Sequence, residues 1–406
     1  MKFGLLGRKL GHSYSPQIHA CFGDYPYGLF EKEPEQVGDF LKNGDFSGIN
    51  VTIPYKKDVI PYCDELTETA RKMGAVNTIV RRKGKLIGHN TDYFGFTSML
   101  RRSGLKIAGK KALVLGSGGA SLTAQKVLAE AGAQVVVISR RGENNYQNLH
   151  LHADASLIVN CTPVGMYPNN GVSPVDLSLF ENLEGVLDMI YNPSRTQLVT
   201  DAEKRGLVAE NGLWMLVAQA KESAEWFLGH ALEDSCIQAT HRVLKSQMEN
   251  IILIGMPGCG KSTVASLLGK ATGRDVVDGD EEIRRTAGMS IPEIFERYGE
   301  DHFRRLETDV LKALGKCSGK IIATGGGCVT RAENYLPLHQ NGTIFWLQRS
   351  LDSLPKDGRP LSLKNSLEDM YRIRRPMYEE FCDYKVQNNG APEDAVNQIL
   401  TLLSKE

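Results

Sequence analysis

The stretch Ile251–Val264 reads IILIGMPGCGKSTV, and it decides the fold of the C-terminal part of a 406-residue chain. A short apolar run leads into Gly255-x4-Gly260-Lys261-Ser262, the full pattern of a phosphate-binding loop between a buried strand and a helix. The glycines let backbone amides face an anion, Lys261 reaches the terminal phosphates, and the Ser262 hydroxyl can ligate Mg²⁺. We therefore predict a nucleotide site here; the alternative is an ordinary glycine-rich turn.

A second glycine-rich turn, in KALVLGSGGASLTAQKVL (111–128), also lies between a predicted strand and a helix. It is a variant of the dinucleotide fingerprint, in which a pyrophosphate approaches the helix N-terminus. The next strand ends in Ser139-Arg140-Arg141, where an NAD enzyme usually places an acidic residue. Guanidinium groups there suit a 2′-phosphate, so we predict NADP, with a solvated arginine pair as the alternative. The predicted cofactor contacts are Gly116, Gly118, Gly119, Ala120, Ser121, Ser139, Arg140 and Arg141.

Length and composition indicate two or three globular domains without a global charge. The chain is 41% hydrophobic and 7% aromatic, which is too apolar for disorder. Its 48 Lys and Arg residues balance 48 Asp and Glu residues, so no overall field favours nucleic acid or an anionic membrane. Anionic ligands must be held by local cations or backbone amides. We expect small-molecule partners; the oligomeric state cannot be predicted.

The cysteine spacing and the N-terminus indicate a cytoplasmic protein. Eight cysteines occur without a Cys-x-x-Cys pair or a zinc-type spacing, which favours reduced thiols. The apolar stretch in MKFGLLGRKLGHSYSP is too short for a signal peptide. No run approaches the roughly 20 apolar residues that span a bilayer.

Short β-like runs alternate with helical stretches along the whole chain, which is typical of an α/β architecture with parallel sheets. The clearest predicted strands are 48–54, 112–116, 133–139, 156–162, 251–255, 320–327 and 343–347. A basic, glycine-punctuated connector at 101–111 and the polar end of a helix at 241–250 suggest two domain boundaries.

Residues typical of a small-molecule kinase follow the phosphate loop in order. Asp278 and Asp280 are two apart and face the same side if the backbone is extended, and Arg304 and Glu307 have helical i, i+3 spacing. Each alone is common in solvated turns or surfaces, but their joint order behind a phosphate loop is not. Further along lie Gly325, Gly326, Gly327, Arg359 and Arg374.

In these motifs residues 250–406 resemble shikimate kinase. The resemblance implies ATP binding by Gly258, Cys259, Gly260, Lys261, Ser262, Thr263 and the lid residue Arg359. It implies Mg²⁺ near Ser262 and Asp278, catalysis by Asp280 and Lys261, and shikimate binding by Asp280, Arg304, Gly325, Gly326, Gly327 and Arg374. The segments flanking GRPLS look shorter than is usual in that family, so we expect an abbreviated lid, and the adenine contacts cannot be assigned.

The N-terminal part carries a second series of polar motifs, which resembles shikimate dehydrogenase over roughly residues 1–245. The motifs are GHSYSPQIHA, NVTIPYK, GAVNT, NTD, NCTPVGM, DMIYNPSRT and NGLWMLVAQA. The resemblance implies a catalytic pair, Lys56 and Asp92, and a nicotinamide contact at Gly212. It implies substrate binding by Ser13, Ser15, Thr52, Asn77, Asp92, Tyr191 and Gln219. A lysine beside an aspartate can deliver the proton that a carbonyl oxygen needs as hydride arrives.

One segment of this region departs from the family pattern. Only about twenty residues separate Arg140 from NCTPVGM, fewer than a helix–strand unit normally takes. We expect a short connection instead of a helix there. The departure concerns the adenine-side pocket and the choice between NADP and NAD, and it leaves the sheet order near the nicotinamide intact.

Together the two resemblances predict three domains and two consecutive reactions. Residues 1–101, completed by helices from about 213–245, would bind the dehydrogenase substrate; 102–212 would form a Rossmann-type NADP domain, and 249–406 a P-loop kinase domain. Shikimate, the product of the first reaction, is the acceptor in the second. The alternatives are an enzyme acting on quinate or another shikimate analogue, and a ligand-sensing protein without turnover. Whether shikimate passes directly between the sites cannot be predicted.

Overall fold

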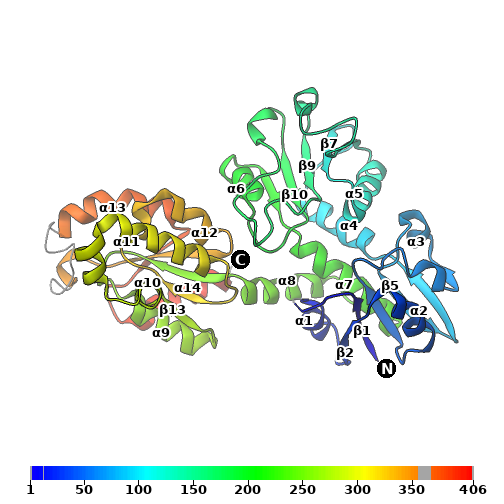
Figure 1. Cartoon of the computed structure of the whole chain (residues 1–406), viewed down its shortest axis with the longest axis horizontal. Helices are drawn as coiled ribbons and strands as arrows, with labels where there is room; N and C mark the ends of the chain where they lie inside the picture. The colour runs from blue at the N-terminus through cyan, green and yellow to red at the C-terminus, as the bar shows by residue number, and fades with distance from the viewer. Residues whose placement is uncertain (1, 12, 355–366, 405–406) are drawn as a thin grey trace. The chain divides into compact units, whose positions relative to one another are not determined.

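The computed structural model describes residues 2–11, 13–354 and 367–404. The chain forms two compact units (Figure 1): unit 1 comprises Met1–Tyr191 and Thr196–Leu244, and unit 2 comprises Asn192–Arg195 and Lys245–Glu406. The division falls within helix α8, Ser235–Met248. Both units are α/β.

The first sheet of unit 1 has six strands in the order β2-β1-β3-β5-β6-β4. Their bounds are β1 Phe3–Gly7, β2 Tyr27–Glu31, β3 Gly48–Val51, β4 Glu65–Leu66, β5 Thr78–Arg82 and β6 Lys85–His89. Strand β5 runs antiparallel to both β3 and β6, so this sheet is mixed, whereas strand–helix alternation predicts parallel pairing. The reason is local: Lys83 and Gly84 alone join β5 to β6, both with positive φ, as a two-residue hairpin requires.

Helices from distant parts of the chain cover this sheet. They are α1 Ser15–Ala20, α2 Pro34–Asn43, α3 Glu68–Met73 and α7 Leu213–Leu228. Helix α4, Asp92–Ser103, packs against α7 and shares a core with Lys111–Leu115 and Leu157–Asn160 of the second sheet. Helix α7 packs against α4 and contacts β3 and β5, although more than 130 residues of sequence separate it from β5. It therefore brings Gln219 to a site whose Lys56, Asn77 and Asp92 precede Ser103 in the sequence.

The second sheet of unit 1 is entirely parallel, in the order β11-β10-β9-β7-β8. Its strands are β7 Lys111–Leu115, β8 Gln134–Ile138, β9 Leu157–Asn160, β10 Gly185–Asp188 and β11 Val208–Glu210, with α5 Gly119–Glu130 and α6 Gln197–Lys204 between them. Between β8 and β9 the chain has only the 3₁₀ turn Leu149–His152, which confirms the expected short connection. The strand order reverses at β7, and ligands of open parallel sheets bind where this reversal occurs.

Unit 2 contains a parallel sheet in the order β13-β14-β12-β15-β16. The strands are β12 Asn250–Ile254, β13 Val276–Asp278, β14 Ile321–Ala323, β15 Gly342–Gln348 and β16 Tyr384–Gln387. The helices are α9 Lys261–Thr272, α10 Gly279–Ala287, α11 Ile291–Gly315, α12 Tyr335–His339, α13 Leu367–Phe381 and α14 Pro392–Ser404, with a kink in α11 at Gly299. Strand β12 is buried and central, so the loop after it emerges at the reversal of strand order.

Two further expectations concern the chain as a whole. All eight cysteines are free thiols, as their spacing predicts. Over the residues that the structure describes, none of the helices is long and apolar enough to cross a membrane.

Candidate active sites

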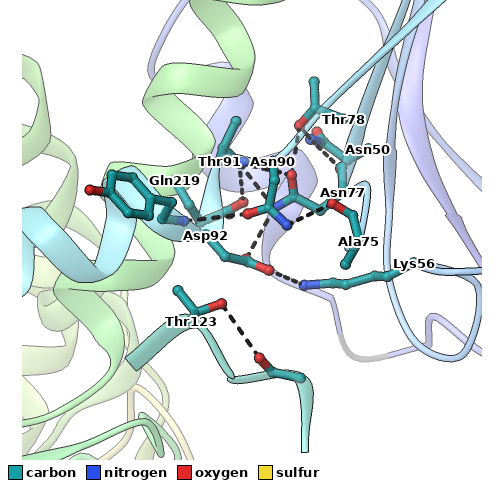
Figure 2. A network of polar contacts seen from close by, with 12 residues as sticks. Asn50, Lys56, Ala75, Asn77, Thr78, Asn90, Thr91, Asp92, Thr123 and Gln219 are labelled. Carbon is teal, nitrogen blue, oxygen red and sulfur yellow. Dashed lines mark hydrogen bonds and ion pairs between the residues drawn. The ribbon is translucent and has the colours of Figure 1, made fainter. Parts of the chain in front are cut away.

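Lys56 and Asp92 form the centre of the first site (Figure 2). Lys56 lies in the turn after β3, and Asp92 is the first residue of α4. Lys56 Nζ lies 2.6 Å from Asp92 Oδ2, and Asn77 Nδ2 donates to Asp92 Oδ1 over 3.0 Å. Each carboxylate oxygen thus has its own donor, which fixes the carboxylate and aligns the ammonium group with it. Both charged side chains remain partly exposed, at 30% and 18%, so a ligand can reach them.

A network of mostly buried hydrogen bonds holds Asp92 and its neighbours in place (Figure 2). Asn77 Oδ1 accepts from the Thr91 backbone amide over 2.8 Å, and Asn77 Nδ2 donates to Thr91 Oγ1 over 3.0 Å. Thr91 Oγ1 also lies 3.2 Å from Gln219 Oε1 of α7. The structure therefore brings together the predicted residues Asn77, Asp92 and Gln219. It adds Thr91, which the sequence analysis missed although it is the middle residue of the NTD motif.

Asn50 and Asn90, which also lie in the quoted motifs, make their hydrogen bonds within the protein. Asn50 is 7% exposed, accepts from the Tyr27 hydroxyl over 2.8 Å and donates to Ser223 over 2.8 Å. Asn90 Nδ2 donates to the Ala75 carbonyl over 3.0 Å. These two residues shape the site and have little capacity left for a ligand.

The two predicted serines are neighbours at the start of α1. Ser13 Oγ donates to Ser15 Oγ over 3.1 Å, and the Ser15 amide donates to Ser13 Oγ over 3.2 Å. The ring of the intervening Tyr14 meets Tyr191 edge-on, with centroids 6.2 Å apart, and burial together with Tyr14 raises the pKa of Tyr191. The Thr52 hydroxyl has no hydrogen-bond partner among the described residues and is half-buried, so it is available to a ligand.

The glycine-rich loop after β7 has the geometry of an anion site. Gly116 has φ +102°, and a Cβ there would lie 3.1 Å from Thr162 Cγ2, so the position requires glycine. A Cβ built on Gly118 or Gly119 would meet nothing within 4 Å, so open space lies over both. Because α5 begins at Gly119, the amides of its first turn, including that of Ala120, lack helical partners and face this end.

The remaining predicted cofactor residues have distinct environments. The buried Ser121 hydroxyl donates to Gly116 O over 2.6 Å, so it is used inside the loop. Arg140 and Arg141 follow β8, are exposed, and have no acidic partner within the described part of the chain. The Ser139 amide donates to Asn144 O over 3.1 Å, which closes the turn that carries both arginines.

Asp188 ends β10 of the second sheet, and Gly212 lies in the loop that follows β11. A Cβ on Gly212 would lie 2.2 Å from Met189 O, so only glycine fits before α7. Asp188, at the end of β10, is buried, and this burial raises its pKa to about 6 despite hydrogen bonds from Ile190 N, Thr196 and Asn160. Sequence analysis did not single out Asp188, although it begins the motif DMIYNPSRT.

The second site lies around the loop between β12 and α9. Lys261 is buried, and its Nζ donates to Gly255 O over 2.9 Å and to Met256 O over 3.1 Å. Ser262 Oγ donates to Asp278 Oδ2 over 2.8 Å, so two oxygen atoms that could ligate a metal ion lie together beside the loop. No group of three or more His, Cys, Asp or Glu residues suited to a metal occurs in the described ranges. A Ser–Asp pair nevertheless fits Mg²⁺, which binds through one or two protein oxygens plus substrate phosphates.

The backbone of the predicted aspartate pair is extended at Asp278 but helical at Asp280, so it is not extended throughout. Asp278 ends β13 and caps α10, because its Oδ1 accepts from the amides of Asp280, at 3.0 Å, and Glu281, at 3.3 Å. Asp280 is therefore in the first turn of the helix. Both carboxylates still line the same cleft, as the sequence predicts. The reason is the cap that Asp278 forms at the start of α10 and not an extended backbone.

This cleft, of about 630 Å³, brings the phosphate loop together with the predicted acceptor residues. Arg304 Nη1 and Glu307 Oε2 are 2.7 Å apart and almost fully buried, and burial raises the pKa of Glu307 against the opposing effect of Arg304. A Cβ on Gly327 would lie 2.3 Å from both terminal nitrogens of Arg304, and one on Gly325 would lie 2.7 Å from Asp280 Oδ1. The glycines thus let charged groups lie directly against the backbone.

Arg374 completes the cleft from α13. Its Nη1 donates to Gly326 O over 3.1 Å, and Tyr378, which was not predicted, donates to the same carbonyl over 2.5 Å. Gly258, Gly260, Ser262 and Thr263 line the cleft, whereas Cys259 is buried beneath the loop. Arg359 and the expected lid lie outside the described residues.

Comparisons with known proteins agree with this geometry. Residues 5–79 match the family model "Shikimate dehydrogenase substrate binding domain", and residues 257–404 match "Shikimate kinase". Shikimate dehydrogenase (NADP(+)) from Clostridium beijerinckii is 34% identical over 268 residues, which are 61% of this chain and 99% of that protein. The crystal structure of shikimate dehydrogenase 1 from Peptoclostridium difficile is 37% identical, with a TM-score of 0.55, over 60% of this chain and 97% of that one. The structure of shikimate 5-dehydrogenase from Thermus thermophilus in complex with NADP(H) and shikimate is 30% identical, with a TM-score of 0.55, over 60% of this chain and 99% of that one.

Proposed function

This chain belongs to the shikimate dehydrogenase family and also carries a shikimate kinase domain, and on that premise we propose how its residues perform two consecutive reactions. It is a bifunctional enzyme of the shikimate pathway, and hence of aromatic amino-acid biosynthesis. One part reduces 3-dehydroshikimate to shikimate with NADPH. The other phosphorylates shikimate to shikimate 3-phosphate with ATP and Mg²⁺.

We propose three domains for these tasks. Residues 1–101, completed by helices from 213–245, bind the dehydrogenase substrate; residues 102–212 bind NADP, and residues 249–406 form the kinase. The packing of α7 against α4, β3 and β5 supports the first assignment. The eight free cysteines support a cytoplasmic location, because reducing compartments keep thiols free.

In the dehydrogenase, Lys56 and Asp92 carry out the proton transfer that accompanies the reduction. NADPH, when bound, supplies the hydride. The Lys56 ammonium, held 2.6 Å from Asp92, donates the proton that the substrate oxygen takes up. Asn77 keeps Asp92 in place through its own hydrogen bond, so the ammonium group stays directed toward the ligand.

The side chains around this pair are suited to a small polyhydroxylated acid. Ser13 and Ser15 present adjacent hydroxyls for the substrate carboxylate. Thr52, Asn77, Asp92, Tyr191 and Gln219 hold the ring and its hydroxyls.

The NADP site fits the residues present around the second sheet. Open space over Gly118 and Gly119, next to the first-turn amides of Ala120 and Ser121, suits the pyrophosphate. Exposed Arg140 and Arg141, after Ser139, suit a 2′-phosphate. Gly116 lets the loop turn, and Gly212, which lies against Met189 O, would contact the nicotinamide.

In the kinase, charge is neutralised around a positioned hydroxyl. Asp280 orients and deprotonates the 3-hydroxyl of shikimate, and Lys261 neutralises the phosphates. Ser262 and Asp278 would hold Mg²⁺, and Arg359 is the proposed lid residue. The remaining assignments are the phosphate-loop contacts of Gly258, Cys259, Gly260 and Thr263, and the acceptor contacts of Arg304, Gly325, Gly326, Gly327 and Arg374.

One observation carries the proposal: a single chain holds both the Lys56–Asp92 pair and a cleft that joins Lys261 to Asp280 and Arg304. The test is to assay the two half-reactions separately with the purified full chain. NADPH oxidation with 3-dehydroshikimate, and ADP formation with shikimate, are both expected. Preference for quinate would indicate the analogue enzyme, and ligand binding without turnover would indicate a sensor.

A further inference from the structure

Two residues outside the predicted set follow adjacent strands beside the phosphate loop. Strands β15 and β16 are paired in parallel, with Gln348 opposite Gln387, so Arg349 and Asn388 are the next residues at the same end of the sheet. The backbone amide of Asn388 donates to Gln348 O over 2.8 Å and continues the pairing of the two strands. Strand β15 also pairs with β12, whose end carries the phosphate loop.

Asn388 holds the phosphate loop directly. Its side chain is buried, at 3% exposure, and its Nδ2 donates to Cys259 O over 2.7 Å. A Cβ on Gly260 would lie 2.6 Å from the same nitrogen, so the carboxamide lies against the loop where α9 begins. Its Oδ1 is buried and has no hydrogen-bond partner in the described part of the protein.

Arg349 lines the cleft together with Gly260 and Lys261. Its Nη1 is 4.0 Å from the position of a Cβ on Gly260, and its Nε is buried without a hydrogen-bond partner among the residues that the structure describes. No carboxylate within the described ranges pairs with it.

The other arginines of the cleft are all engaged. Arg284 pairs with Glu281, Arg304 pairs with Glu307, and Arg374 donates to the Gly326 carbonyl. An unpaired guanidinium group beside a helix N-terminus and a phosphate loop is positioned to bind an anion. Buried unsatisfied polar atoms cost free energy, and such atoms are kept where a ligand needs them.

The strand order shows which part of the nucleotide Arg349 meets. Asp278 and Asp280 follow β13, whereas Arg349 follows β15, and β12 lies between these two sides of the sheet. The transferred phosphoryl group must face the acceptor at Asp280, so the rest of the phosphate chain faces the β15 side. Resting on the proposed kinase function, we propose that Arg349 binds the α- and β-phosphates of the nucleotide, with Asn388 as a positioning residue that fixes the loop beside it.

This contact exists before and during phosphoryl transfer, which predicts its kinetic signature. Uniform binding of substrate and transition state lowers KM without raising kcat. Loss of Arg349 therefore raises KM for ATP and leaves KM for shikimate unchanged. ADP keeps both phosphates, so its affinity falls as well.

The test is calorimetric titration of the full chain with Mg-ADP, which needs no turnover. Arg349→Met keeps the aliphatic stem and removes the charge, and we expect about 10-fold weaker ADP binding or more, since hydrogen bonds to charged groups contribute about 1.5–3 kcal/mol. Arg349→Lys keeps a point charge and should lose less. Arg372→Ala is the matched control, because Arg372 is a highly exposed α13 arginine paired with Asp369.

The possible results separate the role of Arg349 from the proposed kinase function. Unchanged ADP affinity in Arg349→Met, or an equal loss in Arg372→Ala, overturns the proposal. A raised KM for shikimate instead of ATP also overturns it, because Arg349 would then serve the acceptor. If the parent chain binds ADP but does not phosphorylate shikimate, the proposed kinase function fails, while the ADP titration still judges Arg349. Should Arg349→Met melt at a much lower temperature, the comparison of Arg349→Lys with the parent decides.

Discussion

Lys56 Nζ and Asp92 Oδ2 lie 2.6 Å apart, while the other oxygen of the same carboxylate accepts from Asn77. The two charged residues come from different elements, a turn after β3 and the start of α4. The Asn77 bond leaves the carboxylate one orientation, and this orientation directs the ammonium group. We attribute the proton transfer of the dehydrogenase to this arrangement.

Replacing Lys56 with Ala should abolish most of the reduction. General acid catalysis by one positioned group contributes about 10²–10⁴-fold, so kcat for 3-dehydroshikimate should fall by that factor. The rate of shikimate phosphorylation, measured on the same preparation, should stay at the parent value. A variant that reduces the substrate normally would refute the role of Lys56.

Lys261→Ala should have the converse effect. The ammonium group lies within the phosphate loop. In the proposed mechanism it neutralises charge during transfer, so its removal should lower the phosphorylation rate on the order of 10²-fold or more. NADPH oxidation with 3-dehydroshikimate serves as the internal control and should not change. Persistent phosphorylation would contradict the assignment of the second site.

Thr91→Val should weaken the network that orients Asn77 and Gln219. The substitution leaves the buried Asn77 Nδ2 with one partner fewer, which should cost roughly 1–3 kcal/mol in the free energy of unfolding. It should also lower kcat/KM for 3-dehydroshikimate, because both side chains belong to the proposed substrate site. Thr91→Ser keeps the hydroxyl and should retain most of the activity. Equal losses in both variants would point to packing of the methyl group instead.

Asp188 should make the stability of unit 1 depend on pH. Its pKa is about 6 in the fold against 3.8 when unperturbed, so the folded state binds the proton more tightly than the unfolded state. Its contribution to stability is therefore greatest below about pH 4 and is lost as pH rises to about 6. Asp188→Asn lacks this titration, and its Oδ1 can still accept from Ile190 and Asn160.

The measurement is the melting temperature of Asp188→Asn and the parent between pH 4 and pH 8. The melting temperature of the variant should rise relative to that of the parent as pH increases to about 6, and the difference should stay constant above that pH. The corresponding change in the free energy of unfolding is about 3 kcal/mol at most. Parallel curves over the whole range would show that Asp188 does not titrate as its burial implies.

Both nucleotide loops could be predicted because each is contiguous in sequence. A strand, a glycine turn and a helix start contain the glycines and helix-start amides of the anion site, from Gly255 to Ser262 in one case and from Gly116 to Ser121 in the other. The short connection between β8 and β9 was equally predictable, since too few residues are present for a helix.

Other features depend on contacts that sequence spacing does not contain. The Asp278–Asp280 geometry differs from an extended backbone because Asp278 caps α10. Thr91 was missed because its partner Gln219 is 128 residues away. Arg349 belongs to no motif, and its position becomes meaningful only when Asn388 and Gly260 are found beside it.

The most direct test of the bifunctional assignment is mass spectrometry of the purified full chain supplied with 3-dehydroshikimate, NADPH and Mg-ATP together. We predict shikimate 3-phosphate, which should disappear when either NADPH or ATP is omitted. Shikimate without its phosphate would confirm the reductase and contradict the kinase. No conversion at all would contradict both assignments and favour a different substrate or a sensory role.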